Sequence, residues 1–213
     1  MDHDFWLERW QQGRTAFHEG KTNALLSAVF PRLSLNAGDR VFVPLCGKAE
    51  DLDWLVAQGC RVVGAELSQM AVEAAFERMG LAPDIDPLGE LTRYRAGAVE
   101  IFVGDVFRLT AEALGAVDAV YDRAALVALP EAMRRDYARH LIATTAAARQ
   151  LLIAFEYDQT RMDGPPFSVP ETEIRALYAE TYALERAVDV DIGGPLAERA
   201  GSVRETAWLL KAD

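Results

Sequence analysis

The residues best suited to bind a small molecule gather around an unusual loop near residue 45. In the stretch VFVPLCGKAEDLDWL (41–55), an apolar run leads into a loop with one glycine, Gly47, and the spacing of an amphipathic helix follows. In a doubly wound α/β protein, a loop at this place binds a nucleotide or a nucleoside. Phosphate-binding loops carry two or three glycines, because the pyrophosphate approaches the backbone closely. The loop therefore disfavours NAD and permits a ligand without phosphates.

A second candidate residue, Glu66, follows about twenty residues after this loop. It ends the β-rich run 61–66, where an acidic side chain can accept hydrogen bonds from both hydroxyls of a ribose. Ribose recognition without a phosphate loop permits S-adenosylmethionine, which has a ribose, an adenine and an amino-acid tail but no phosphate. We assign Gly47, which makes the turn, and Leu67, beside Glu66, to the same site. The alternative is an ordinary βαβ unit with a solvated Glu66.

The stretch GDVFRL (104–109) follows a third β-rich run and would lie beside the adenine of such a cofactor. Asp105 can pair with an amino group, and Val106 and Phe107 can pack on the ring. The alternative is a turn capped by Asp105, with the two apolar residues in the core.

Arg123 is the candidate catalytic residue. It lies with Asp122 in YDRAALVALP (121–130), at the end of a fourth β-rich run. A guanidinium there can hold the carboxylate of the methionine moiety or a polar substrate. The alternative is an Asp122–Arg123 ion pair on the surface.

Aromatic residues at two places could wall the same site. Trp6, Trp10 and Phe17 are candidates for a lid over the sulfonium, whose positive charge is attracted to aromatic faces. Phe167 follows the rigid Gly-Pro-Pro turn of GPPFSV and could supply a further wall. His18 is either a site residue or a loop histidine, and packing alone would also account for the tryptophans.

The elements that must position these residues alternate between apolar runs and helical spacing. Two helical pieces are expected within 5–30, separated by a loop around 15–19, and residues 81–93 are expected to form a loop because they hold two prolines and Gly89. Strands are expected at 40–45, 61–66, 99–103, 117–121, 151–157, 184–190 and 206–210, and helices at 51–58, 68–79, 130–148 and 170–181. This order predicts a doubly wound α/β fold whose last two strands form an antiparallel pair at one edge. We expect one domain over 1–213, in which 1–35 form a helical lid or extension.

Composition limits the possible partners. The chain has 213 residues, of which 51% are hydrophobic and 26% charged, and a formal net charge of −11. The acidic surface disfavours a nucleic-acid partner. The two cysteines, Cys46 and Cys60, form no zinc motif, and no apolar run is long enough for a membrane span. We expect a cytoplasmic monomer without a metal or a membrane partner, acting on a small molecule.

Several segments, in order, resemble the bacterial thiopurine S-methyltransferases. They are WLERW, FH, VPLCGKAEDLDWL, GAELS, GDVF, DRAALVALP and GPPFSV, between about Trp6 and Val169. The resemblance implies the class I methyltransferase fold, which is Rossmann-like, with a seven-stranded, mostly parallel sheet, an antiparallel last strand and S-adenosylmethionine as methyl donor.

The resemblance also implies residue roles. Trp6, Trp10 and Phe17 would cover the cofactor, Leu45 would belong to its loop, and Asp105 and Val106 would flank the adenine. The resemblance implies that Glu66 binds the ribose and that Arg123 lies beside both the cofactor and the acceptor. The substrate-binding set would be Phe17, His18, Arg123, Phe167 and a C-terminal arginine, for which Arg199 is the candidate and Arg204 the alternative.

The expected reaction is the transfer of a methyl group to a soft nucleophile, a thiopurine or a compound of selenium or tellurium. Whether a general base takes part is left open. The alternatives are a methyltransferase for another acceptor, such as a halide, a small thiol or a macromolecule, and a module that binds S-adenosylmethionine without catalysis.

Overall fold

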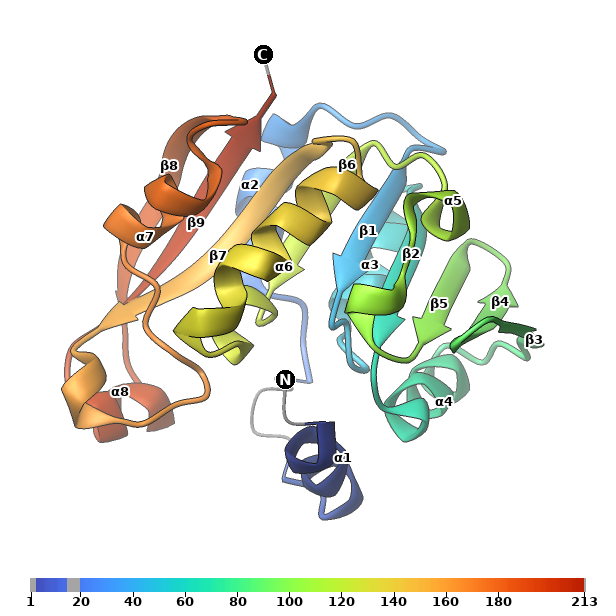
Figure 1. Ribbon diagram of the computed structural model, residues 1–213, viewed down its shortest axis with the longest axis horizontal. Helices are drawn as coiled ribbons and strands as arrows, with labels where there is room; N and C mark the ends of the chain where they lie inside the picture. The colour runs from blue at the N-terminus through green and yellow to red at the C-terminus, as the bar shows by residue number, and fades with distance from the viewer. Residues whose placement is uncertain (1–2, 15–19, 213) are drawn as a thin grey trace.

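The protein is built on one mixed β-sheet, seen in a computed structural model that describes residues 3–14 and 20–212. In the described chain the sheet has nine strands in the order β3-β4-β5-β2-β1-β6-β7-β9-β8 (Figure 1). The middle strands β5, β2, β1, β6 and β7 run parallel. They span Val99–Val103, Arg61–Glu66, Arg40–Pro44, Ala119–Arg123 and Arg149–Tyr157. Their carboxyl ends therefore meet along one edge of the sheet, as the doubly wound fold requires.

The expected strand count of seven is wrong, because residues 81–93 are not a loop. They contribute to a hairpin of β3 (Asp84–Leu88) and β4 (Leu91–Ala96), and β4 pairs antiparallel with β5. Proline is tolerated here because β3 is an edge strand, where Pro87 removes no hydrogen bond from the ladder interior. At the other edge, β8 (Ala183–Ile192) and β9 (Val203–Lys211) form the predicted antiparallel pair.

Helices cover both faces of the sheet. On one face lie α2 (Ala24–Val29), η1 (Phe30–Leu33), α3 (Asp51–Ala57) and α4 (Gln69–Arg78). On the other lie η2 (Val106–Arg108), α5 (Ala111–Leu114), η3 (Leu126–Ala128), α6 (Glu131–Thr144) and α7 (Glu171–Tyr178). Figure 1 shows α5, α6 and α7 in front of the sheet and α2 behind it.

Short helices and caps mark where the chain turns. Ser68 caps α4, because its hydroxyl accepts a hydrogen bond from the Ala71 amide at 3.3 Å. Between the last two strands we expected no helix, yet α8 (Pro195–Ala200) forms one short helix there. Together with η4 (Gln159–Arg161), α8 lies beyond the carboxyl ends of the parallel strands (Figure 1).

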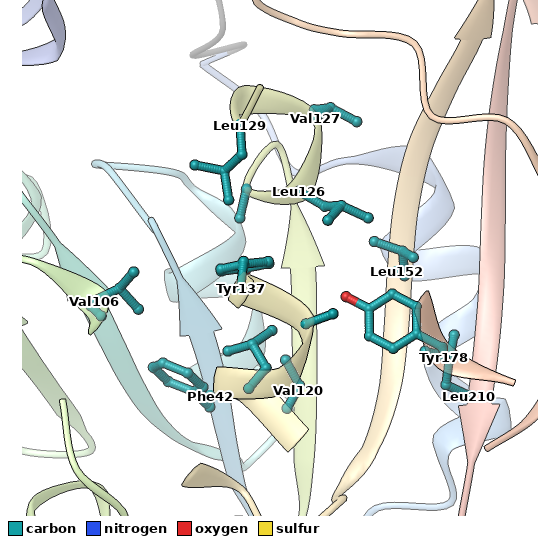
Figure 2. Packing of buried hydrophobic residues seen from close by; sticks show 14 of the residues in the cluster. Phe42, Val106, Val120, Leu126, Val127, Leu129, Tyr137, Leu152, Tyr178 and Leu210 are labelled. Carbon is teal, nitrogen blue, oxygen red and sulfur yellow. The ribbon is translucent and has the colours of Figure 1, made fainter. Parts of the chain in front are cut away.

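The core has two layers, one on each face of the sheet. Successive strand residues point to opposite faces, so Phe42 packs in one layer while Val41 and Val43 pack in the other. Figure 2 shows the first layer, in which Tyr137 of α6 and Tyr178 of α7 pack over the sheet. Because both faces are covered, the parallel strands are apolar along almost their whole length.

The N-terminal helix α1 (His3–Gln11) lies beyond the carboxyl-end edge of the sheet (Figure 1). Trp10 is its buried residue, and its indole packs on the loop after β1. Within the described ranges, no helix has the length and apolar character needed to cross a membrane.

Candidate active site

A cavity of about 400 Å³ opens at the carboxyl ends of the parallel strands. Its walls come from the loops after β1, β2, β5 and β6, from the end of β7, and from α1 and α8. This volume suits a small molecule, and the position is where ligands bind in doubly wound sheets.

The loop after β1 reaches the cavity in an unusual backbone conformation. Leu45 has a φ of 49° and Gly47 a φ of 53°, and both line the cavity. A positive φ is rare for leucine and costs on the order of 1 kcal/mol, so such residues concentrate at functional sites. The loop is held by the Cys46 amide, which donates to the Ala65 carbonyl of β2 at 3.0 Å.

Glu66 fastens this loop to the end of β2. Its side chain is buried, and its two carboxylate oxygens accept hydrogen bonds from the Gly47 and Ser68 amides, each at 2.8 Å. Burial raises the pKa of Glu66, and the backbone hydrogen bonds from Ser68, Gly47 and Leu67 oppose that rise. Each carboxylate oxygen has a second acceptor site, so Glu66 retains hydrogen-bonding capacity toward the cavity that it lines.

Cys46 lines the cavity but is poorly suited to nucleophilic chemistry. It is buried, and burial together with the nearby Glu66 charge raises its pKa well above the usual range. A thiol in such surroundings stays protonated at neutral pH, and the thiolate is the reactive form.

The last two residues of β6, Asp122 and Arg123, point to opposite faces of the sheet. Arg123 lines the cavity, whereas Asp122 is fully buried and accepts hydrogen bonds from the Tyr137 hydroxyl at 2.8 Å and the Leu126 amide at 3.1 Å. Burial raises the pKa of Asp122 to about 6. Asp122 is therefore not half of a surface ion pair. Ala124, the next residue, has a φ of 63° and also lines the cavity.

Sequence reasoning missed a polar group in the cavity wall. The Tyr121 hydroxyl donates to Asp51 at 3.0 Å, the Asn23 amide donates to the other Asp51 oxygen at 2.7 Å, and both Tyr121 and Asp51 line the cavity. One signal could have found Tyr121: it is two residues before Arg123 on the same strand, so both point to one face. Glu205 of β9 also lines the cavity, and no local pattern marks it.

Several predicted residues do line the cavity: Trp6, Trp10, Leu45, Gly47, Glu66, Leu67, Val106, Arg123 and Arg199. The structure thus brings together residues from α1, from four strand ends and from α8. Phe17 and His18 lie outside the described residues.

Three other predicted residues lie outside the cavity lining. Asp105 caps η2 by accepting from the Phe107 amide at 3.0 Å, and it also contacts His3 at 3.2 Å. Phe107 packs on Tyr137, with ring centroids 6.5 Å apart, and so adjoins the core. Phe167 borders a second, more open groove beside α6 and α7, although the two prolines before it line the main cavity.

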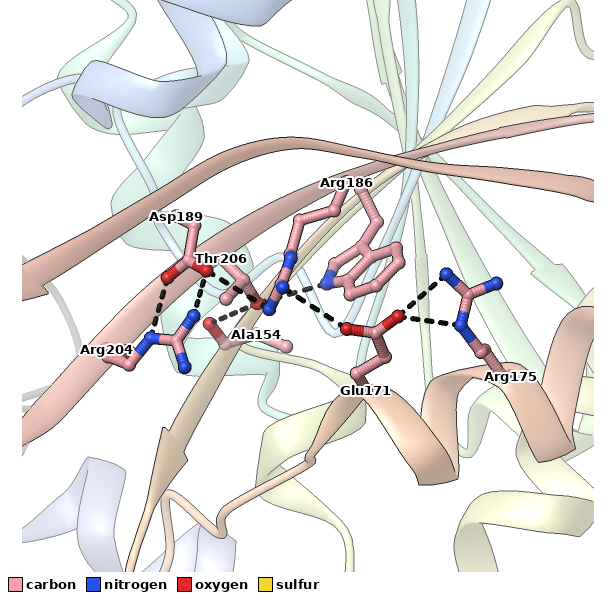
Figure 3. Close-up of polar contacts among 8 residues, drawn as sticks. Ala154, Glu171, Arg175, Arg186, Asp189, Arg204 and Thr206 are labelled. Carbon is pink, nitrogen blue, oxygen red and sulfur yellow. Dashed lines mark hydrogen bonds and ion pairs between the residues drawn. The ribbon is translucent and has the colours of Figure 1, made fainter.

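The two C-terminal arginines have different surroundings. Arg199, on α8, lines the cavity. Arg204, on β9, pairs with Asp189 in an ionic network that continues through Arg186 to Glu171 (Figure 3). Of the two, only Arg199 is placed to meet a ligand in the cavity. Among the described residues, no cluster of His, Cys, Asp or Glu is arranged to hold a metal ion.

Comparison with known sequences gives one consistent family. The family described as "Thiopurine S-methyltransferase" matches residues 1–212. The chain is 51% identical over 212 residues to the thiopurine S-methyltransferase of Xanthobacter autotrophicus, and the match covers 99% of each chain. It is 46% identical over 204 residues to the enzyme of that name from Gluconobacter oxydans, covering 96% of this chain and 92% of the relative.

Two solved methyltransferases with low sequence identity to this chain have a similar fold. The magnesium protoporphyrin IX methyltransferase of Synechocystis, with bound S-adenosylmethionine, has a TM-score of 0.68 at 16% identity, and the match covers 100% of this chain and 98% of that one. The 1,6-didemethyltoxoflavin-N1-methyltransferase of Burkholderia thailandensis, with bound S-adenosylhomocysteine, has a TM-score of 0.67 at 17% identity, covering 99% and 87%. These likenesses establish the class I methyltransferase fold.

Proposed function

The chain belongs to the thiopurine S-methyltransferase family, and from this premise we propose that the cavity binds S-adenosylmethionine between Glu66 and Arg123. The protein is an S-adenosylmethionine-dependent methyltransferase of the thiopurine type. The observation that carries the residue assignment is the anchored Glu66 carboxylate, which shares one cavity with Arg123.

Glu66 and its surroundings form the cofactor half of the cavity. The carboxylate is already oriented by two backbone amides, so binding a ribose requires little further ordering. Gly104 and Val106 line the wall beyond β5 and would lie against the adenine. Trp6 and Trp10 of α1 line the cavity as well, where their rings can face the sulfonium.

The acceptor half surrounds Arg123. Val127, Phe155, Pro165 and Pro166 give this part of the cavity apolar walls. We infer that the acceptor sulfur attacks the methyl carbon in line, a sulfur–carbon bond forms, and the bond to the sulfonium breaks to release neutral S-adenosylhomocysteine. A thiolate and a sulfonium lose their opposite charges in this step, so positioning between dry walls favours it. Arg123 would stabilise the anionic form of the acceptor.

Two substitutions distinguish the proposed catalytic role of Arg123 from the proposed cofactor-binding role of Glu66. Arg123→Ala should lower kcat by about 100-fold or more, because it removes the charge beside the acceptor. Glu66→Ala should raise the Michaelis constant for S-adenosylmethionine by about 10- to 100-fold while kcat at saturation changes less. Initial rates measured with a thiopurine test both kinetic predictions. Arg139→Ala is the control, because Arg139 lies on the exposed face of α6. Unchanged kinetics in both variants would refute the assignment.

An acceptor screen with labelled S-adenosylmethionine tests the substrate class. Turnover is expected with thiopurines, and the screen should include selenium and tellurium compounds, halides and small thiols. A protein that binds S-adenosylhomocysteine in calorimetry yet methylates none of them would be a binding module. We also infer a cytoplasmic, single-domain monomer without a nucleic-acid partner.

A further inference from the structure

Two arginines at the cavity have no anionic partner among the described residues. Arg9 of α1 and Arg199 of α8 both line the cavity. The Nε atom of Arg9 is buried without a hydrogen-bond partner, while its guanidinium stacks on the Phe5 ring at 4.6 Å. By contrast, Arg32, Arg40, Arg78 and Arg134 each form an ion pair with a described carboxylate. Arg9 and Arg199 have no such carboxylate partner among the described residues, although both line the cavity.

The two guanidinium groups share one cavity wall, and their charges interact. Burial lowers the pKa of Arg9, and the positive charges of Arg14 and Arg199 lower it further. Two like charges brought together at a partly buried place are unfavourable unless an anion joins them. An anion between them would accept charge-assisted hydrogen bonds from both guanidinium groups, which is the arrangement that carboxylates and phosphates prefer.

We propose that Arg9 and Arg199 form an anion subsite in the active-site cavity, and that the preferred acceptor carries an anionic substituent apart from its nucleophilic sulfur. This rests on the proposed function, because it places the acceptor in the half of the cavity that Arg199 lines. The apolar residues Pro195 and Leu196, also on α8, line the space beside Arg199 and would hold the body of such an acceptor. Since Arg9 belongs to α1, the acceptor's anion would also bind α1 to the rest of the molecule.

The test compares two thiols that differ in one group, 4-mercaptobenzoate and 4-methylbenzenethiol. Arg9→Gln and Arg199→Gln should each lower kcat/KM for 4-mercaptobenzoate by about tenfold or more, since each removes a charge-assisted contact. For the neutral thiol, kcat/KM should change by less than about threefold, and Arg9→Lys should restore part of the preference. The dissociation constant of S-adenosylhomocysteine, measured by calorimetry, should stay unchanged.

Arg14→Gln is the matched control. Arg14 follows α1 but is exposed, contacts Glu8 at 4.0 Å and is not part of the cavity lining. Its replacement should leave both thiols and cofactor binding unaffected.

Three results would overturn the proposal. If the two thiols lose activity equally while S-adenosylhomocysteine binds more weakly, the arginines hold the cofactor's own carboxylate. If neither thiol responds to the substitutions, no anion subsite exists, although the methyltransferase assignment stands. If the wild type methylates neither thiol and no thiopurine, the proposed function fails and this inference with it.

Discussion

The carboxyl group of Asp122 is fully buried, and this burial makes the stability of the protein depend on pH. Its pKa is raised to about 6 by burial, whereas an unfolded aspartate titrates near about 3.9. The native state therefore holds a proton that the unfolded state releases between these values. The stabilisation is fully present below about pH 4 and is lost as the pH rises through about 6.

Asp122→Asn should remove this dependence, because the amide carries no charge at any of these pH values. Between about pH 4 and 7, the free energy of unfolding of the wild type should fall relative to that of Asp122→Asn by on the order of 2–3 kcal/mol. Urea unfolding at a series of pH values measures it. Tyr137→Phe should move the window to higher pH, because the Tyr137 hydrogen bond lowers the Asp122 pKa. A constant difference between wild type and Asp122→Asn would contradict the account.

Single residues of the site were predictable where a strand end places them. Glu66 and Arg123 end β2 and β6, and runs of apolar residues mark those strands in the sequence. The roles of adjacent residues were harder to predict, because their side chains point in different directions. Val106 lines the cavity, while Phe107 packs toward α6. Glu205 could not be predicted, because only the pairing of β9 with β7 brings it opposite Phe155 at the cavity.

At the scale of elements, the loop after β1 and helix α1 are in direct contact. A methyl group added at Gly47 would lie 3.2 Å from the Trp10 ring, and the φ of 53° disfavours any side chain. Gly47→Ala should therefore displace Trp10 and weaken the cofactor site. The expected result is a rise of about tenfold or more in the dissociation constant of S-adenosylhomocysteine, measured by calorimetry.

Gly97→Ala separates backbone strain from this contact. Gly97 has a φ of 57°, almost that of Gly47, but nothing lies within 4 Å of the added methyl. Both variants should lose on the order of 1 kcal/mol of stability. Only Gly47→Ala should change cofactor binding, and equal binding by the two variants would show that Trp10 does not couple to the loop.

The elements that the sequence predicted well are those with two clear boundaries. The parallel strands and the helices between them follow apolar periodicity, with caps such as Ser68. The hairpin β3–β4 was missed because its prolines and Gly89 are typical of loops. Gly89 makes the tight turn between the strands, and its φ of 62° suits it to that place. Only the position of β3 at the sheet edge makes a proline acceptable there, and edge position is a property of the whole sheet.

At the scale of the whole molecule, the net charge of −11 and the arginines of the cavity act in opposite directions. An acidic surface repels anions at long range, and it repels a polyanion such as nucleic acid most strongly. Among the described residues, the cavity lining holds four basic ones, Arg9, Lys48, Arg123 and Arg199, against three acidic ones, Asp51, Glu66 and Glu205, so its local charge is slightly positive. A small anion can reach this local field where a long polyanion would have to cross the acidic surface.

The cavity is lined by residues from both ends of the chain, from Trp6 of α1 to Glu205 of β9, so its ligand should stabilise the molecule as one unit. Ligand at 100 times its dissociation constant adds about 2.7 kcal/mol. For a chain of 213 residues this corresponds to a rise in Tm of about 5–10 °C. Scanning calorimetry with S-adenosylhomocysteine should show a single transition that shifts by this amount, and the shift should shrink in Glu66→Ala at the same ligand concentration. A second transition that stays in place when ligand is added would mean that part of the chain folds apart from the cavity, against the single-domain expectation.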